Sequence, residues 1–127
     1  MGYEYIIDSS AWIEYFNGST KGEKIKNIIE EKIIGTSILA IVELADKFER
    51  ENKNFEDELN FIKSRASIIP ISINIALESA KIKKEFRIKN SKFGIADSIH
   101  IATSKSENSK FITSDNDFMP FKNIILI

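Results

Sequence analysis

The chain has no cysteine, and only two prolines and five glycines are spread over its 127 residues. The lack of cysteine excludes a disulfide framework, a zinc–cysteine site and catalysis by a thiol. No Pro/Gly/Ser-rich linker and no internal repeat divides the chain, so we expect one domain over residues 1–127. A chain of this length can bury a hydrophobic core without disulfides or a structural metal.

The chain also lacks long apolar runs and an excess of charge of either sign. No segment approaches the roughly 18 uninterrupted apolar residues of a membrane span, and the first residues lack the basic and apolar regions of a signal peptide. We therefore expect a cytoplasmic protein with no membrane association. The formal net charge is -1, whereas domains that bind nucleic acid are often basic. This value does not exclude a nucleic-acid substrate, because a carboxylate cluster that holds metal also lowers the net charge.

Short apolar runs alternate with helical patterns along the whole chain, and these runs indicate buried strands. The expected strands lie at residues 5–7, 33–34, 68–69 and 111–112, with a candidate fifth at 124–126. The expected helices lie at residues 9–16, 21–31, 37–48, 55–62, 73–89 and 94–102. This order predicts an α/β fold, namely a three-layer α/β/α sandwich with a central, mainly parallel sheet of four or five strands.

Four acidic residues are expected at one edge of this sheet. Asp8 and Asp115 follow the carboxyl ends of the first and fourth strands, and sites in such sheets form outside those ends. Asp97 lies in the first turn of its helix, which faces the same edge. Glu43 lies beside an amphipathic stripe, so its side chain can lean towards the rim. The stripe consists of Ile38, Ile41, Val42, Ala45 and Phe48.

Asp97 gives the strongest physical argument for a bound cation. Most of its helix neighbours are apolar, and a buried, unpaired carboxylate costs several kcal/mol or takes a raised pKa. The helix N-terminus compensates in part, and a cation shared with Asp8 and Asp115 would compensate further. Mg²⁺ and Mn²⁺ favour carboxylate oxygens, and a site of this kind can activate water for the hydrolysis of a phosphodiester.

Each acid taken alone also has a purely structural explanation. An aspartate at a strand end or helix start is often only a cap, and Glu43 can be a solvated residue paired with Lys47 four positions later. Asp117 can simply begin the turn before Phe118. The convergence of several carboxylates on one predicted edge favours a shared metal instead.

Four segments in this order resemble the PIN-domain nucleases, and in particular the small VapC-type toxins of toxin–antitoxin pairs. They are residues 6–10 (IIDSS), 37–44 (SILAIVEL), 96–102 (ADSIHIA) and 113–118 (TSDNDF). The resemblance extends over essentially the whole chain. It implies an α/β/α sandwich and cleavage of RNA that depends on Mg²⁺ or Mn²⁺, and it also implies a homodimer and an antitoxin partner.

The resemblance also assigns roles to individual residues. The catalytic metal ligands that it implies are Asp8, Glu43, Asp97 and Asp115. Asp117 can assist or replace Asp115, because the family varies there. Ser10 and Thr113 match polar positions that steady the acids by hydrogen bonds. His100 stands where the family commonly has a small residue, and the resemblance leaves it without a role.

Histidine 100 is the only histidine, and it shares a helix face with Asp97 three positions earlier. It can shuttle a proton or contact substrate, but we favour a partly buried histidine with a hydrogen-bond partner, because histidines are often buried. The aromatic residues Trp12, Tyr15 and Phe16 can stack on RNA bases. They can equally pack against a second copy or an antitoxin, which is the use that the resemblance favours.

A basic run over residues 81–92 precedes the helix of Asp97. Lys84, Arg87 and Lys92 are candidate contacts to RNA phosphates. Glu78 and Glu85 are mixed into this part of the chain, which favours the alternative of a solvated helix face.

The function predicted from these observations is a Mg²⁺- or Mn²⁺-dependent endoribonuclease that is the toxin of a VapBC-type pair. A housekeeping PIN nuclease of RNA processing or decay would use the same chemistry, so this alternative stays open. A non-catalytic PIN-like binding module would lack an acid, and this chain has all of them. A phosphotransferase would need a second aspartate where Ser10 stands, and a dinucleotide site would need a glycine-rich loop there.

Overall fold

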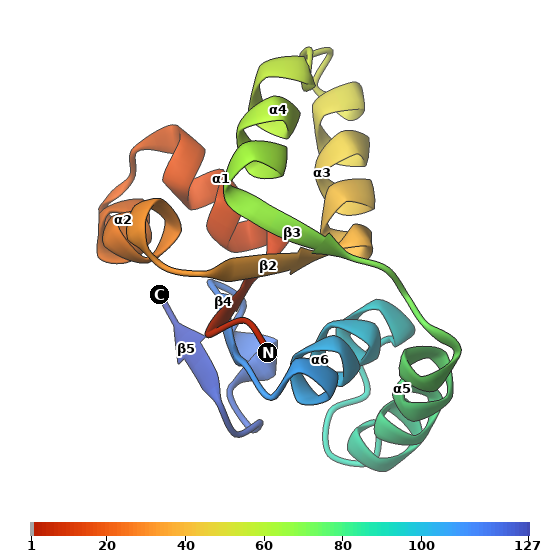
Figure 1. The fold of residues 1–127 in the computed structure, drawn as a ribbon. Helices are drawn as coiled ribbons and strands as arrows, with labels where there is room; N and C mark the ends of the chain where they lie inside the picture. Colours follow the sequence, from red (N-terminus) through yellow and green to blue (C-terminus); the bar gives the residue numbers. More distant parts are fainter. Residues whose placement is uncertain (1) are drawn as a thin grey trace.

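A five-stranded parallel sheet lies at the centre of the computed structural model, which describes residues 2–127 (Figure 1). The strands are β1 (Tyr5–Ile7), β2 (Ile34–Ser37), β3 (Ala66–Ile69), β4 (Lys110–Thr113) and β5 (Ile124–Leu126). Their order is β3-β2-β1-β4-β5, and Ile6 of the middle strand pairs with Gly35 on one side and Phe111 on the other. The strand order therefore reverses between β1 and β4, which is where parallel sheets form their sites.

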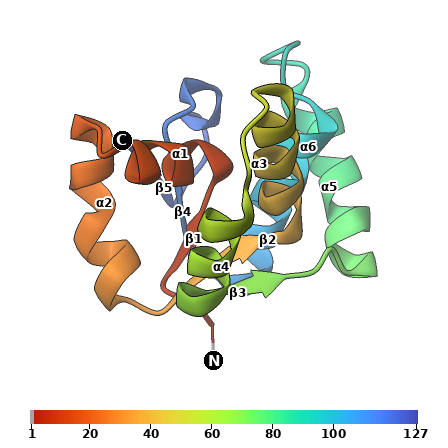
Figure 2. The same ribbon diagram turned by 90° about the horizontal axis from the view of Figure 1, so that it is seen from above.

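Helices cover both faces of this sheet (Figures 1 and 2). The helices of one face are α1 (Ser9–Asn17), α2 (Thr20–Glu31), α3 (Ile38–Arg50) and α4 (Glu56–Arg65). The helices of the other face are α5 (Ile73–Phe86) and α6 (Ile95–Glu107). A short 3-10 helix, η1 (Asn116–Phe118), follows β4. The predicted α/β/α arrangement is confirmed, and the sheet has five strands, all parallel.

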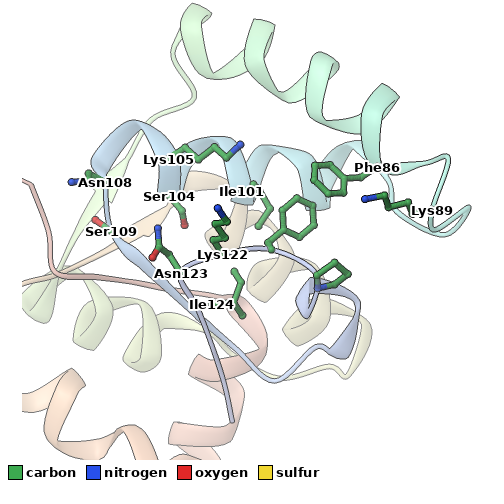
Figure 3. Close-up of a pocket in the computed structure, with 12 residues that line it drawn as sticks. Phe86, Lys89, Ile101, Ser104, Lys105, Asn108, Ser109, Lys122, Asn123 and Ile124 are labelled. Atoms are coloured by element: carbon green, nitrogen blue, oxygen red, sulfur yellow. The ribbon is translucent and has the colours of Figure 1, made fainter.

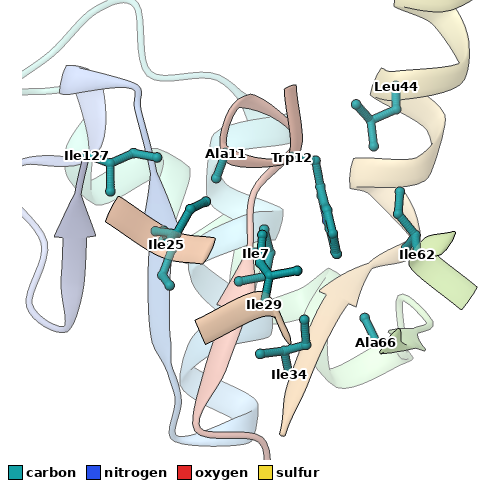
Figure 4. Packing of buried hydrophobic residues seen from close by; sticks show 11 residues of the cluster. Ile7, Ala11, Trp12, Ile25, Ile29, Ile34, Leu44, Ile62, Ala66 and Ile127 are labelled. Carbon is teal, nitrogen blue, oxygen red and sulfur yellow. The ribbon is translucent and has the colours of Figure 1, made fainter. Parts of the chain in front are cut away.

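Side chains that alternate along the central strands build a hydrophobic core on each face. Ile7 and Ile112 pack on the side of α1 to α4 (Figure 4), whereas Ile6 and Phe111 pack against α5 and α6. Successive residues of a strand face opposite sides, so each apolar pair in β1 and β4 serves both cores. This double burial explains why these strands are apolar throughout.

Trp12 fixes α1 to the sheet from inside the first core. Its side chain is fully buried, and its indole N–H donates to Thr36 Oγ1 over 3.1 Å. The Thr36 hydroxyl in turn donates to the carbonyl oxygen of Ile7 over 2.6 Å. The contacts with RNA or a partner that we predicted for Trp12 are therefore wrong, because this residue is part of the core. Tyr15 and Phe16 remain partly exposed.

The helices α1 and α2 form a closely packed hairpin around Gly22. A Cβ atom at this position would lie 2.2 Å from the carbonyl oxygen of Glu14, so only glycine allows this approach of the two backbones. Gly18 ends α1 with a φ of 63°, and the Ser19 hydroxyl begins α2 by accepting the Gly22 N–H over 3.0 Å. Backbone packing therefore fixes the angle between these helices.

The orientation of α3 differs from the prediction. The most deeply buried residues of this helix are Ala40 and Leu44, whereas Ile38 and Val42 of the predicted stripe are 37% and 57% exposed. Both faces of α3 carry apolar residues, so periodicity could not tell which of them meets the sheet. Two consequences follow: Glu43 lies next to a buried position, and an apolar strip of α3 faces outwards.

Candidate active site

The carboxylate of Asp8 is the buried centre of the candidate site. Asp8 follows β1 directly and caps α1, and it is 4% exposed. Its Oδ1 accepts the Ser9 backbone N–H over 2.8 Å, and its Oδ2 accepts the hydroxyls of Ser10 over 2.9 Å and Thr113 over 2.7 Å. Donors from α1 and β4 therefore hold this carboxylate in one orientation and compensate for its burial.

The same two hydroxyls also shape the loop that carries Asp115. The Ser10 hydroxyl accepts the Ser114 N–H, and the Thr113 hydroxyl accepts the Asp115 N–H, each over 3.0 Å. Asp115 Oδ1 then accepts the N–H of Asp117 over 2.9 Å and caps η1. The loop after β4 is thus fixed to Asp8, although Asp115 and Asp117 are only partly buried.

Glu43 reaches the site from α3. Its Oε1 accepts the Ser9 hydroxyl over 3.1 Å and lies 2.8 Å from His100 Nε2. Partial burial alone would raise the pKa of Glu43, but the hydrogen bonds and charge of His100, with the Ser9 hydroxyl, outweigh it and the pKa is lowered. Lys47, the partner considered for a solvated Glu43, is instead paired with Glu51 at 2.6 Å.

Asp97 approaches from the start of α6. Its Oδ2 accepts the N–H of Gly94 over 3.0 Å and so caps the helix. Burial raises the pKa of Asp97, the hydrogen bond from Gly94 opposes this, and the charges of Asp115 and Asp117 raise the pKa further. The net pKa is above its ordinary value, as expected for a carboxylate that shares a partly buried site with other carboxylates.

His100 is the residue whose place in the site the sequence did not reveal. It is 2% exposed, and its Nε2 lies 2.8 Å from Glu43 Oε1 and 3.7 Å from Asp8 Oδ1. Burial lowers its pKa, but the hydrogen bond to Glu43 and the charges of Asp8, Glu43 and Asp97 outweigh burial, so the pKa is raised. Its Nδ1 has no hydrogen-bond partner within residues 2–127. The spacing from Asp97 was the one available signal.

The donor atoms fit a divalent cation. One atom each from Asp8, Glu43 and His100 lie within 4.8 Å of one another. The two carboxylates suit Mg²⁺ and Mn²⁺, whereas the imidazole is paired with Glu43. Asp97 and Asp115 are outside this closest group. The Thr113 hydroxyl links Asp115 to it, because it accepts the Asp115 N–H and donates to Asp8, and Asp97 lies three residues before His100 on α6.

A shallow cleft of about 370 Å³ opens beside this cluster. It is lined by Ser9, Ser10, Ile13, Glu14, Glu43, Leu44, Lys47, Arg50 and Ser114. The three basic residues predicted to contact RNA lie elsewhere, at the end of α5 and in the loop before α6. Lys84, Arg87 and Lys92 are exposed, and none of them forms an ion pair within the described part of the chain.

Residues 5–123 match the sequence model of the PIN domain. The chain belongs to the PIN domain family. No curated protein matches the sequence significantly. No helix in residues 2–127 of this PIN domain is long and apolar enough to cross a membrane.

Solved structures with the same fold include several toxin–antitoxin proteins. A toxin–antitoxin complex from Klebsiella pneumoniae aligns with a TM-score of 0.74 and 21% identity, covering 95% of each chain. VapBC2 from Rickettsia felis, bound to a promoter DNA fragment, aligns with a TM-score of 0.77 and 19% identity over 97% of this chain and 96% of that chain. VapC20 from Mycobacterium tuberculosis, described as a sarcin-ricin loop cleaving toxin, gives 0.66 and 13% identity over 91% and 93%.

The raised pKa of Asp97 predicts a pH-dependent stability difference. A carboxyl group whose pKa is raised by folding destabilises the folded state when it is ionised. This cost is absent below the ordinary pKa of 3.8 and grows as the pH rises through the folded-state value. Asp97→Asn removes the charge and keeps an oxygen that can accept the Gly94 N–H. The change should therefore raise the melting temperature of the metal-free protein at pH 7 by a few degrees.

Thermal unfolding with a chelator at several pH values measures this effect. The gain should shrink as the pH falls towards 4, and Glu23→Gln on the exposed surface of α2 is the matched control. A gain that is independent of pH, or no gain at pH 7, would show that Asp97 carries no such cost.

Proposed function

We propose that this PIN domain is a Mg²⁺- or Mn²⁺-dependent endoribonuclease that serves as the toxin of a toxin–antitoxin pair. The observation that carries the proposal is the convergence of acids from four elements on a buried, hydrogen-bonded Asp8. His100 lies against Glu43 and Asp8, and Asp97 is on the same helix three residues earlier. The loop of Asp115 is held by the hydroxyls that also bind Asp8. A site built only for stability would not gather these charges, because like charges in a partly buried site repel one another.

The residues of the site would have different roles in this reaction. Asp8 and Glu43 would hold the metal, with Asp97 and Asp115 completing its shell, and Asp117 stays a candidate for assisting Asp115. The bound metal would supply an activated water and neutralise charge on the phosphodiester. Ser10 and Thr113 keep Asp8 oriented by donating to its Oδ2.

Asp8→Asn and Asp97→Asn should each abolish cleavage of RNA. Each change replaces a charged metal ligand, so we expect the rate to fall by at least about a hundredfold. The assay uses purified protein, total RNA and mapped product ends, with Mg²⁺ or Mn²⁺ and then with a chelator. Wild-type cleavage that survives chelation, or variants that cut at the wild-type rate, would contradict the metal mechanism.

Growth of cells that express the protein separates the two biological alternatives. Arrest by the wild type but not by Asp97→Asn favours a toxin, as do the toxin–antitoxin descriptions of the structures similar in fold. Cleavage in vitro without arrest favours a housekeeping nuclease. A binding module without catalysis predicts no cleavage in either assay.

His100 has the place of a positioning residue in this proposal. Its ring packs against Phe111 and Phe118, with centroids 5.5 and 6.4 Å away. The Glu43 carboxylate can only accept a hydrogen bond, so Nε2 carries a proton and donates it to Glu43. Because the Glu43 side chain is 36% exposed, this hydrogen bond and the one from the Ser9 hydroxyl keep its carboxylate turned towards Asp8 rather than solvent.

Substitution of His100 should therefore weaken metal binding only through Glu43. We expect His100→Leu to reduce affinity for Mn²⁺ by about tenfold, as for other residues that orient a metal ligand. His100→Gln should restore part of it, because its amide can donate from a similar position. Mn²⁺ binding is measured by titration calorimetry and by electron paramagnetic resonance.

A double-mutant cycle with Glu43→Ala tests the route of this effect. In the Glu43→Ala background, His100→Leu should change Mn²⁺ affinity little, and Thr103→Val on the same helix should change it little in either background. Additive losses would show that His100 acts independently of Glu43, for instance as a ligand itself.

We also propose a homodimer formed through the outward apolar strip of α3 and the neighbouring strip of α5. Val42 is 57% exposed, and Ile73 and Leu77 are 79% and 62% exposed. The two helices cover opposite faces of the sheet, but both lie at the same end of the molecule, one on each side of α6 (Figure 2). Large apolar side chains that gather on one side indicate an interaction surface.

Leu77→Glu should dissociate this dimer, because it places a charge in the apolar contact. Light scattering after gel filtration should give the mass of two chains for the wild type and of one chain for the variant. Ile33→Glu is the control, because Ile33 is 66% exposed at the start of β2, away from both helices. A single-chain mass for the wild type at micromolar concentration contradicts the proposal.

A further inference from the structure

A second cavity, of about 530 Å³, lies away from the acids, between α6, the end of α5 and the segment that leads into β5 (Figure 3). It is larger than the cleft beside Glu43 and is within the usual size range of sites for small ligands. Neither the acids nor the hydrogen bonds that orient them contribute to its lining. Its shape and chemistry therefore need an explanation of their own.

The lining of this cavity is positively charged. Lys89, Lys105 and Lys122 line it and no aspartate or glutamate does, although the whole chain has a net charge of -1. None of the three lysines forms an ion pair with another described residue. Unneutralised ammonium groups around one cavity favour an anionic ligand, and phosphate is the anion that an RNA substrate offers.

One wall of the cavity is aromatic. The rings of Phe86 and Phe121 have centroids 4.1 Å apart at an angle of 42°, and both side chains are only partly buried. The Lys89 ammonium lies 5.9 Å from the centroid of the Phe86 ring. Aromatic faces beside cationic groups are the combination that binds single-stranded nucleic acid, because the rings stack on bases while the cations contact phosphates.

Ser104 adds an unpaired polar group to this lining. Its Oγ is buried and has no hydrogen-bond partner within residues 2–127, and the residue is 6% exposed. Buried polar atoms almost always have partners. This hydroxyl is covered in the present arrangement, so a small rotation of its side chain would bring it to a ligand in the cavity.

The cavity is close enough to the acids to bind another part of the same strand. Asp97 and Lys105 lie on one helix, about 12 Å apart along its axis at 1.5 Å per residue. The ring of Phe93, which precedes the Gly94 cap of Asp97, packs 5.1 Å from Phe121 between centroids. The aromatic wall is therefore continuous with the residues that position α6 in the active site.

We propose that this cavity binds one nucleotide of the RNA away from the bond that is cleaved, with its phosphate on the lysines and its base against Phe86 and Phe121. The proposal rests on the proposed ribonuclease function, and it gives that function a second contact with substrate. An apolar peptide would use the aromatic wall, but it would leave the three lysines and the Ser104 hydroxyl without partners. A free nucleoside monophosphate has the same chemistry as the RNA nucleotide, so the test must separate them.

The test uses Asp97→Asn protein with a chelator, so that RNA is bound and not cut. A fluorescent single-stranded RNA of mixed sequence is titrated by anisotropy against this protein and against versions that also carry Lys105→Gln and Lys122→Gln. We expect the double change to weaken RNA binding at least about tenfold and to reduce the salt slope by about 0.7, since the lysines contact one phosphate and each phosphate contact on a single strand contributes about 0.7. Phe121→Leu should weaken binding about tenfold through lost stacking.

Lys24→Gln with Lys26→Gln on α2 is the matched control, because it removes the same charge from a surface outside the cavity. The control pair should change the logarithm of the RNA dissociation constant by less than half of the change caused by the Lys105 and Lys122 pair. Equal losses for both pairs would show that only general charge matters, and would overturn the proposal. No loss for the cavity pair would overturn it as well.

Two further arms separate other occupants. Binding of the four nucleoside monophosphates (of adenosine, cytidine, guanosine and uridine) is measured by titration calorimetry. If this binding needs Lys105 and Lys122, and if the lysine variants bind RNA as the unchanged protein does, the cavity is a site for a free nucleotide instead. A change in mass by light scattering in the lysine variants would assign it to an interface between copies. Either result overturns the proposal.

Cleavage by the wild-type protein distinguishes the failure of this inference from the failure of the proposed function. Metal-dependent cleavage with normal RNA binding by the lysine variants refutes only the nucleotide subsite. Loss of binding in those variants, with no cleavage by the wild type under any metal, supports an RNA contact in the cavity and refutes the nuclease.

Discussion

The arrangement of the site depends on the hydrogen bonds that satisfy the buried carboxylate of Asp8. Ser9 and Ser10 reach it from α1, and Thr113 reaches it from β4. The same hydroxyls hold the backbone of the loop that carries Asp115. One buried charge therefore joins the middle strand, the first helix and the fourth strand, and the other acids take their places around a fixed point rather than around one another.

The acids differ in how far hydrogen-bond donors of the protein compensate the negative charge of each carboxylate. Asp8 receives donors from several groups, and Glu43 has His100 and Ser9, so its pKa is lowered. Asp97 has one backbone donor and two neighbouring carboxylates, and its pKa is raised. The unmet charge is thus concentrated where α6 begins and the loop after β4 ends. This imbalance supports the proposal that a cation binds at this side of the site.

The parallel sheet and the edge that carries Asp8, Asp97 and Asp115 could be predicted, because strands that alternate with helices run parallel and place their carboxyl ends at one edge. The contact between Glu43 and His100 could not, because it depends on how α3 and α6 are rotated, and α3 has apolar residues on two faces. Trp12 shows the same limit: an aromatic residue near a site can be exposed or buried, and only the position of Thr36 decides it. The cavity lined by Lys89, Lys105 and Lys122 joins segments far apart in sequence, so no local pattern indicates it.

The contact of Gly22 with the backbone of Glu14 has a consequence for any protein that binds the first two helices. The hairpin of α1 and α2 cannot open without losing this contact, and it cannot close further because no space remains. A partner therefore meets a surface that is already in its final shape, so association there would lose little conformational entropy on the side of this chain. The cost of ordering would fall on the partner, whose own folding would then set the affinity and the lifetime of the complex.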